Sequence, residues 1–281
     1  MQRVDLHLHS SASDGLFPPR EVVRRAHGAG LAGIALTDHD TLSGLPEAAR
    51  EAARLRLCLV PGCEISIVHG DRDLHLLAYF VDADDERMRA LLSSMEALRR
   101  ERVTEMVHRL NSCGLALTLE EVWAQAGGSS AVGRMHVARA LVQGGYVTRL
   151  GEAFARHIGA DCPAYVPKRT PPAPAVLDTV WETGAVPVLA HPGAYDGLDP
   201  EHELGGWDLG GVEAFHPAHS PQQEARLVAW AARRGWVITG GSDWHGEDRA
   251  SDYLGCRSVA LEVVAALRAL RRRRTPRRSS S

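Results

Sequence analysis

Hydrophobic and polar positions in the first third of the chain alternate between short apolar runs and longer amphipathic stretches. The apolar runs predict strands, and the stretches between them predict helices; Pro18 and Pro19 open the first helix and Gly28 closes it. The expected elements are, in order, a strand at 4–9, a helix at 18–28, a strand at 33–38, a helix at 45–55, and strands at 57–61 and 73–80. Pro61-Gly62-Cys63 is expected to form a turn after the strand at 57–61. This βαβ rhythm predicts a largely parallel sheet, open or closed.

The rhythm stops near Asp84, and a helical pattern takes its place. Four helices are expected there, at 87–110, 119–125, 136–142 and 150–157. A proline-rich segment at 163–174 then leads back to the alternation. The remaining expected elements are a helix at 175–183, strands at 185–190 and 211–215, a helix at 221–233, a strand at 236–239 and a helix at 259–270.

The pattern as a whole predicts one α/β domain that is interrupted by a helical insert. The domain takes residues 1–83 and 170–270, and the helical insert takes residues 84–169. Arginines crowd residues 271–281, which end in three serines, so we expect a disordered basic tail there. Such a tail increases solubility, and binding of nucleic acid is the alternative.

The composition is ordinary for a soluble globular protein, with 44% hydrophobic and 24% charged residues among 281. The net charge of −3 gives no overall attraction to nucleic acid. The five cysteines form no C-x-x-C pair, and Met1 leads almost directly into a strand, which leaves no room for a secretory leader. We therefore expect reduced thiols and a cytoplasmic protein. No apolar stretch is long enough to span a bilayer, so no membrane partner is expected.

Candidate chemistry gathers where the expected strands end. Nine imidazoles and carboxylates lie at or shortly after such ends: His7, His9, Asp14, His39, Glu64, His75, His191, Asp243 and His245. A barrel-like fold would bring these ends to one rim. Imidazole and carboxylate are ligands that divalent transition metals prefer, so the set indicates a metal cluster. A half-buried histidine pair is the alternative for His7 and His9 alone, but it does not explain the whole set.

These motifs resemble those of the PHP (polymerase and histidinol phosphatase) superfamily of metal-dependent phosphoesterases. The matching segments are Asp5-Leu6-His7-Leu8-His9-Ser10, Ser13-Asp14-Gly15, Thr37-Asp38-His39-Asp40-Thr41, Pro61-Gly62-Cys63-Glu64, His75, Ala190-His191-Pro192 and Ser242-Asp243-Trp244-His245-Gly246. The resemblance covers nearly the whole chain. It implies a distorted (β/α)7 barrel with an inserted helical lid subdomain, and a cluster of usually three metal ions at the rim.

The resemblance also implies how the ligands divide among the ions. The implied groups are His7, His9, Glu64 and Asp243 for one ion, Glu64, His75 and His191 for a second, and Asp14, His39 and His245 for a third. The mixed ligand set favours Mn²⁺, Zn²⁺ or Fe²⁺ over Mg²⁺ and Ca²⁺. Family membership favours Mn²⁺ among these. Asp5 and Asp38 are candidates for orienting the ligating imidazoles.

Such a cluster predicts hydrolysis of a phosphoester without a nucleophilic side chain. A water held between two ions loses a proton near neutral pH and can attack phosphorus in line. The ions also neutralise the phosphate oxygens and the departing oxygen. His216, which follows the expected strand at 211–215, is our candidate catalytic residue, either protonating the leaving oxygen or contacting substrate. A structural role for His216 stays open.

The helical insert is expected to set the substrate. Its segments at 133–142, 151–154 and 163–168 resemble a PHP subgroup that removes the 3′-phosphate from nucleoside 3′,5′-bisphosphates, with relatives that act as 5′→3′ exoribonucleases on 5′-phosphorylated RNA. The expected partners are therefore a small nucleotide and short RNA. Four residues of the insert are candidates for holding the 5′-phosphate: Arg99, Arg102, Arg134 and His136. Lys168 is a weaker one, and a solvated helix face is the alternative for Arg99 and Arg102.

Two other functions are also compatible with these motifs. The first is hydrolysis of histidinol phosphate or of another small phosphomonoester. The second is a non-catalytic PHP module that holds metal for structure alone. Nine ligands argue against the second, because a structural site needs only about four. The sequence leaves the oligomeric state open.

Overall fold

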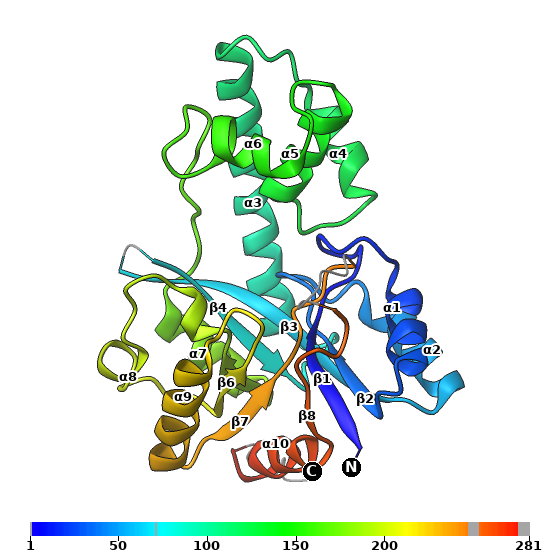
Figure 1. The fold of residues 1–281 in the computed structure, drawn as a ribbon, viewed down its shortest axis with the longest axis vertical. Coiled ribbons are helices and arrows are strands. Elements are labelled where there is room, and N and C mark those ends of the chain that lie inside the picture. Colours follow the sequence, from blue (N-terminus) through cyan, green and yellow to red (C-terminus); the bar gives the residue numbers. More distant parts are fainter. Residues whose placement is uncertain (1, 71, 247–252, 275–281) are drawn as a thin grey trace.

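A computed structural model describes residues 2–70, 72–246 and 253–274. At its centre an eight-stranded sheet curls into a nearly closed barrel with helices outside it (Figure 1). The strands are β1 (Arg3–Leu8), β2 (Gly33–Leu36), β3 (Cys58–His69), β4 (Arg72–Tyr79), β5 (Val186–Leu189), β6 (Gly211–Phe215), β7 (Val237–Gly240) and β8 (Val259–Ala260). The α/β barrel class expected from the sequence is confirmed.

The strands follow the order β7-β6-β5-β4-β3-β2-β1-β8. The β1–β3 and β5–β7 runs are parallel within themselves, whereas β4 is antiparallel to both of its neighbours and β8 is antiparallel to β1. Every residue of β2 and of β5 is buried, which suits strands that are covered on both faces. The chain closes the barrel after β7, where the Asp243 amide donates to the His7 carbonyl at 2.9 Å and Trp244 bridges Leu8.

The helices divide between the barrel wall and the helical insert. Around the barrel lie α1 (Pro19–Gly28), α2 (Leu45–Leu55), α7 (Ala173–Glu182), η2 (Pro192–Ala194), α8 (Pro200–Glu203), α9 (Pro221–Arg234) and α10 (Glu262–Arg274). The insert holds α3 (Glu86–Ser112), α4 (Leu119–Ala126), α5 (Arg134–Gln143), α6 (Leu150–Ala153) and the π-helical turn η1 (Phe154–Ile158). No helix among the described residues is both long and apolar enough to cross a membrane.

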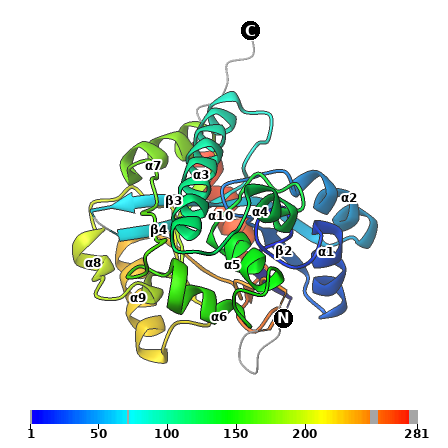
Figure 2. The same ribbon diagram turned by 90° about the horizontal axis from the view of Figure 1, so that it is seen from above.

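The helical insert overlies one end of the barrel in both views (Figure 1 and Figure 2). Its outer part has a hydrophobic core of its own, in which Val103, Met106 and Leu110 of α3 pack with Val137 and Leu141 of α5. The N-terminal turns of α3 instead pack on the barrel through apolar side chains such as Met88. Helix α3 therefore joins two cores.

Three expectations from the sequence were wrong in detail. Strand β3 runs on to His69 and forms a hairpin with β4, because Pro61 and Gly62 mark not a turn but the point where β3 leaves β2 and pairs with β4. A short strand, β8, begins the segment that was expected to be wholly helical from residue 259. Helix α10 continues to Arg274, so the arginines at 271–274 are helical rather than disordered, and 275–281 lie outside the described residues.

Candidate metal centre and substrate cavities

The nine candidate ligands lie together at the rim of the barrel that faces the helical insert; we call them the rim cluster. Eight come from β1, from β3, or from loops that follow β1, β2, β5 and β7, so the carboxyl ends of parallel strands deliver most of them to the same edge. The antiparallel β4 reaches this edge near its start, which places His75 opposite Ser66 of β3. The structure therefore brings together side chains that are more than 200 positions apart, as in the 3.3 Å approach of His7 to Asp243.

The first group is the most deeply buried. Nε2 of His7 lies 3.2 Å from Oε2 of Glu64 and 3.3 Å from Oδ1 of Asp243, and Nε2 of His9 lies 3.2 Å and 3.0 Å from the same two oxygens. One ligand atom from each of these four residues fits within 4.8 Å of the others. The geometry is that of a single cation site.

Glu64 also extends to a second group through its other oxygen. Oε1 lies 2.8 Å from Nδ1 of His75 and 2.9 Å from Nε2 of His191, while Oε2 lies 3.0 Å from Nδ1 of His39. His39, Glu64 and His75 offer ligand atoms within 4.8 Å of one another. Glu64 therefore stands between two groups, the arrangement that a bridging carboxylate requires.

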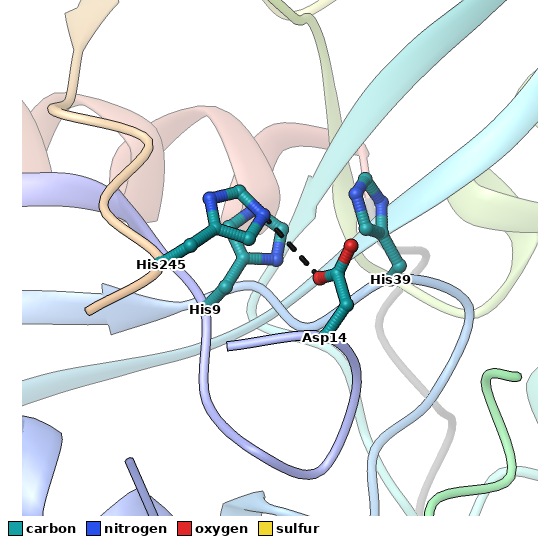
Figure 3. Close-up of side chains that lie close together, drawn as sticks. All are labelled: His9, Asp14, His39 and His245. Carbon is teal, nitrogen blue, oxygen red and sulfur yellow. Dashed lines mark ion pairs between the residues drawn. The ribbon is translucent and has the colours of Figure 1, made fainter. Parts of the chain in front are cut away.

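The third group is shown in Figure 3, where the carboxylate of Asp14 lies between the rings of His39 and His245. Asp14 Oδ1 is 3.3 Å from Nε2 of His245, and the rings of His245 and His9 stack with centroids 4.1 Å apart. Ligand atoms of all four residues lie within 4.8 Å. His9 thus adjoins this group as well as the first.

The rim cluster fits divalent cations. Among the described residues, several of its buried ligand atoms have no hydrogen-bond partner: His7 Nε2, both ring nitrogens of His9, Asp14 Oδ1, His39 Nδ1, Glu64 Oε2, His75 Nδ1 and Asp243 Oδ1. Leaving so many buried polar atoms unpaired costs free energy that a bound cation would recover.

The charges inside the cluster favour metal binding by the carboxylates. Burial alone would raise the pKa of Glu64, but the imidazoles of His39, His75 and His7 hold it well below its usual range. Burial opposes the protonated form of His9, yet Asp243 and Glu64 raise its pKa to about 10. The carboxylates are therefore anionic at neutral pH, and a metal must displace a proton from such an imidazole.

Glu213 supports the cluster and was missed from the sequence. Its carboxylate lies 3.1 Å and 3.2 Å from Nδ1 of His7 and accepts the amide of His191 at 2.9 Å. A proton on His7 Nδ1 leaves Nε2 with its lone pair facing Glu64 and Asp243, which is the tautomer that a metal ligand needs. The available signal was a single charged residue in an otherwise apolar strand.

Asp5 and Asp38 do not orient imidazoles, contrary to expectation. Asp5 accepts hydrogen bonds from the amides of His7 and Ser242, and from the Ser242 hydroxyl. Asp38 accepts from the amide and hydroxyl of Ser10 and from the Ser13 hydroxyl. Both carboxylates thus fix the loops that carry ligands, rather than the ligand rings.

Two cavities open beside the rim cluster, between the barrel and the helical insert. The first, which we call the basic cavity, has a volume of about 340 Å³. It is lined by Asp14, His39 and His75 of the cluster and by four cationic side chains, Arg99, Arg102, Arg134 and Lys168. The second cavity has a volume of about 520 Å³ and reaches the cluster at Asp14, Asp243 and His245.

The cations of the basic cavity are held in different ways. Nε of Arg99 donates to Asp40 at 2.7 Å; burial would raise the pKa of Asp40, but Arg99 and Lys168 lower it to about 2. Arg102 donates from Nε to a backbone carbonyl, and burial followed by the charge of Arg134 lowers its pKa to about 10. Arg134 lies 5.9 Å above the ring centre of Tyr165. Arg99 is thus committed to Asp40, whereas Arg102 and Arg134 repel each other across a space suited to an anion.

His136 and Lys168 differ from expectation. His136 lines the basic cavity, but its Nδ1 accepts the amide of Gly133 at 3.1 Å, and burial lowers its pKa to about 4. The neutral imidazole therefore caps α5 instead of presenting a charge. Lys168 donates to Ser66 at 2.5 Å and lies 3.4 Å from Nε2 of His75, so this residue, ranked low from sequence, stands beside the cluster.

His216 lies at the edge of the second cavity. Its Nδ1 accepts the amide of Ala218 at 3.1 Å, and its Nε2 is 3.4 Å from Oδ2 of Asp243. The neutral tautomer therefore carries its proton on Nε2, directed toward the rim cluster.

Comparison with known proteins gives consistent results. Residues 5–131 match the model of the PHP domain family. A 5′-3′ exoribonuclease from Haemophilus influenzae is 33% identical over 249 residues, covering 87% of this chain and 90% of the relative. A 3′,5′-nucleoside bisphosphate phosphatase from Chromobacterium violaceum is 29% identical over 282 residues, covering 95% and 98%. A solved structure from Bifidobacterium adolescentis, described as a metal-dependent phosphoesterase, is 34% identical and superimposes with a TM-score of 0.89, covering 95% of this chain and 96% of the other.

Proposed function

Because the chain belongs to the PHP family of metal-dependent phosphoesterases, we propose that it hydrolyses the 3′-phosphate of nucleoside 3′,5′-bisphosphates and removes nucleotides from the 5′ end of 5′-phosphorylated short RNA. The chain is a phosphoester hydrolase of this family, and the substrate is the proposed part. The observation that carries it is the basic cavity, which places cations directly beside the rim cluster. A substrate with two phosphates matches two adjoining sites, one for binding and one for reaction.

The rim cluster would hold divalent ions in three groups, with Mn²⁺ as the proposed metal and Zn²⁺ or Fe²⁺ as alternatives. When bound, such ions would activate a water for attack and neutralise charge on the phosphate. Glu64 would join two of the groups through its two oxygens, and Glu213 would keep His7 in the ligating tautomer. Since the liganding atoms already converge, little rearrangement is needed before reaction.

The chain's own residues then bind and orient the nucleotide. Arg102, Arg134 and Lys168 would hold the 5′-phosphate, and Arg99 would fix Asp40 and the wall of the basic cavity. The 5′-phosphate and the 3′-oxygen belong to the same nucleotide, so the leaving oxygen faces the basic cavity. His216 lines the other cavity, so of its two candidate roles we favour donation from Nε2 to a phosphate oxygen over protonation of the leaving oxygen.

A substrate panel tests this function. With Mn²⁺ supplied, adenosine 3′,5′-bisphosphate should be hydrolysed with a kcat/KM higher than that of adenosine 3′-monophosphate, which has no 5′-phosphate to bind. RNA with a 5′-phosphate should be degraded, and the same RNA with a 5′-hydroxyl should resist. Preference for histidinol phosphate would instead support the competing phosphatase function, because that substrate carries a single phosphate.

A further inference from the structure

The second cavity is larger than the proposed bisphosphate substrate requires. Its volume of about 520 Å³ lies within the range of roughly 300–1,000 Å³ that small-molecule sites occupy. The helical insert lines it with Met135, Arg139, Leu150 and Gly151, and the barrel contributes residues that include Ala218. A nucleotide in the basic cavity with its 3′-phosphate at the rim cluster leaves this space unused.

The rim cluster lies between the two cavities. His39 lines only the basic cavity and His245 lines only the second, whereas Asp14 lines both. Figure 3 shows the carboxylate of Asp14 between these two imidazoles. Met135 and Phe154 of the insert also line both cavities, so they form part of a wall that the two cavities share. A phosphorus atom at the cluster can therefore carry one substituent toward each cavity.

This geometry distinguishes a phosphate diester from a monoester, because only a diester has two organic substituents on phosphorus. We propose that the second cavity binds the nucleotide downstream of the scissile phosphate in a 5′-phosphorylated RNA. The inference rests on the proposed function and deepens it, since it gives each of the two nucleotides joined by the scissile phosphodiester a cavity of its own. The bisphosphate is then the limiting case in which the second cavity holds no nucleotide.

The same bond breaks in both substrates. Water adds to phosphorus while the bond from phosphorus to the 3′-oxygen of the first nucleotide breaks, and that oxygen takes a proton. From the bisphosphate the products are inorganic phosphate and a nucleoside 5′-monophosphate. From RNA they are a nucleoside 5′-monophosphate and a chain shortened by one nucleotide, whose new 5′ end carries a phosphate. The product therefore presents the 5′-phosphate that the basic cavity would bind in the next round.

The lining of the second cavity suits a nucleotide of any sequence. Met135, Leu150 and Phe154 provide apolar surface against which a base can pack without reading its hydrogen-bonding edge. Arg139 is half-buried in the wall, and Nη2 donates to the carbonyl of Asp14 at 2.6 Å, which fixes a cation near the path of the next phosphate. We therefore expect binding of the downstream nucleotide that is independent of base identity.

Filling the cavity tests the proposal. Gly151 is exposed, and a Cβ added to it meets no atom within 4 Å, so Gly151→Phe extends into the cavity without a clash of its Cβ. With Mn²⁺ supplied, the variant and the wild type are compared on adenosine 3′,5′-bisphosphate and on the 5′-phosphorylated diribonucleotide of adenosine. We expect kcat/KM for the diribonucleotide to fall about tenfold or more and that for the bisphosphate to change by less than about twofold. Gly28→Phe is the matched control, because Gly28 is also helical and open at its Cβ but lies in α1, away from both cavities.

Ala218→Phe enters the same cavity from the barrel side and repeats the test if Gly151→Phe does not fold. Equal losses on both substrates in both variants would overturn the inference and assign the cavity to the first nucleoside. Unchanged hydrolysis of the diribonucleotide would also overturn it. Either of these results, obtained while the wild type hydrolyses both substrates, would contradict the inference alone. A wild type that hydrolyses the bisphosphate but not the diribonucleotide would contradict both the inference and the RNA part of the proposed function, and one that hydrolyses neither would contradict the whole proposed function.

Discussion

The rim cluster and the outer part of the helical insert are buried in opposite ways. In the cluster the buried atoms are charged or polar. The side chains of His7, His9 and Glu64 are 0% exposed, and several of their nitrogen and oxygen atoms have no hydrogen-bond partner among the described residues. In the outer part of the insert the core consists of apolar side chains, and the cations Arg102 and Arg134 lie at the inner surface of the insert, toward the basic cavity. The unpaired polar atoms of the rim cluster therefore destabilise the barrel until metal ions bind, whereas the insert is stabilised by its own apolar core. Chemistry and substrate choice can therefore be altered separately.

The largest expected effect tests the electrostatic half of this comparison. Glu64→Gln removes the charge that joins two ligand groups, so kcat on the bisphosphate should fall by several orders of magnitude even with saturating Mn²⁺. The far-ultraviolet circular dichroism spectrum should stay close to that of the wild type. Glu86→Gln, at the exposed start of α3, is the control and should keep full activity. If the kcat of Glu64→Gln on the bisphosphate lies within about tenfold of the wild-type value, Glu64 does not bridge two ions that are needed for the reaction.

The next effect tests substrate selection by the helical insert. Arg134→Ala should lower kcat/KM for a nucleoside 3′,5′-bisphosphate by about tenfold to a thousandfold, since it removes a charge-assisted contact of about 1.5 to 4 kcal/mol. The loss on a nucleoside 3′-monophosphate should be small. Arg89 is an exposed arginine of α3, and Arg89→Ala should leave kcat/KM unchanged for both substrates. Equal losses on both substrates in Arg134→Ala would show that the insert does not separate binding from chemistry.

A smaller effect is expected at the support of the cluster. Glu213→Gln keeps the shape of the side chain but weakens its hold on His7, so the affinity for Mn²⁺ should fall by about 10- to 100-fold. Activity should recover largely at high Mn²⁺, because the nine candidate ligands remain. Titration of activity against Mn²⁺ measures both quantities. If excess metal restores none of the lost activity, Glu213 takes part in the reaction itself rather than in positioning His7.

The smallest expected effect concerns pH. Raised pKa values, such as that of about 10 for His9, mean that metal must displace protons, and protons compete more strongly as pH falls. With one net proton displaced, lowering pH from about 7.5 to about 6.5 weakens Mn²⁺ binding about tenfold, or about 1.4 kcal/mol. The Mn²⁺-dependent rise in Tm should then be smaller by about 2 to 3 °C at the lower pH. Thermal unfolding of the metal-free protein at both pH values supplies the baseline Tm. An identical Mn²⁺-dependent rise in Tm at the two pH values would argue against proton displacement.

The sequence predicted the barrel, and it located at strand ends the nine candidate ligands that the fold brings to one rim, because strand ends can be recognised from short apolar runs and the residues that follow them. The sequence did not predict features that depend on which strands pair or on contacts between residues far apart in the chain. The end of β3 was missed since Pro61 and Gly62 read as a turn, although they mark a change of pairing partner. The roles of Asp5 and Glu213 depend on contacts with Ser242 and His7, across 237 and 206 positions, and no local pattern indicates them.

The hydrogen bond from Ser242 to Asp5 also bears on how the protein folds. It joins residues 237 positions apart, and it fixes the loop that delivers Asp243 to the first ligand group. Contacts between distant parts of a chain form late, because loop-closure entropy must be overcome before they stabilise anything. Strand β1 and the loop after β7 must therefore meet before the candidate ligands of the first group can converge. Recovery of metal-dependent activity during refolding should lag behind the return of helical signal, and so report the moment at which the ring of strands closes.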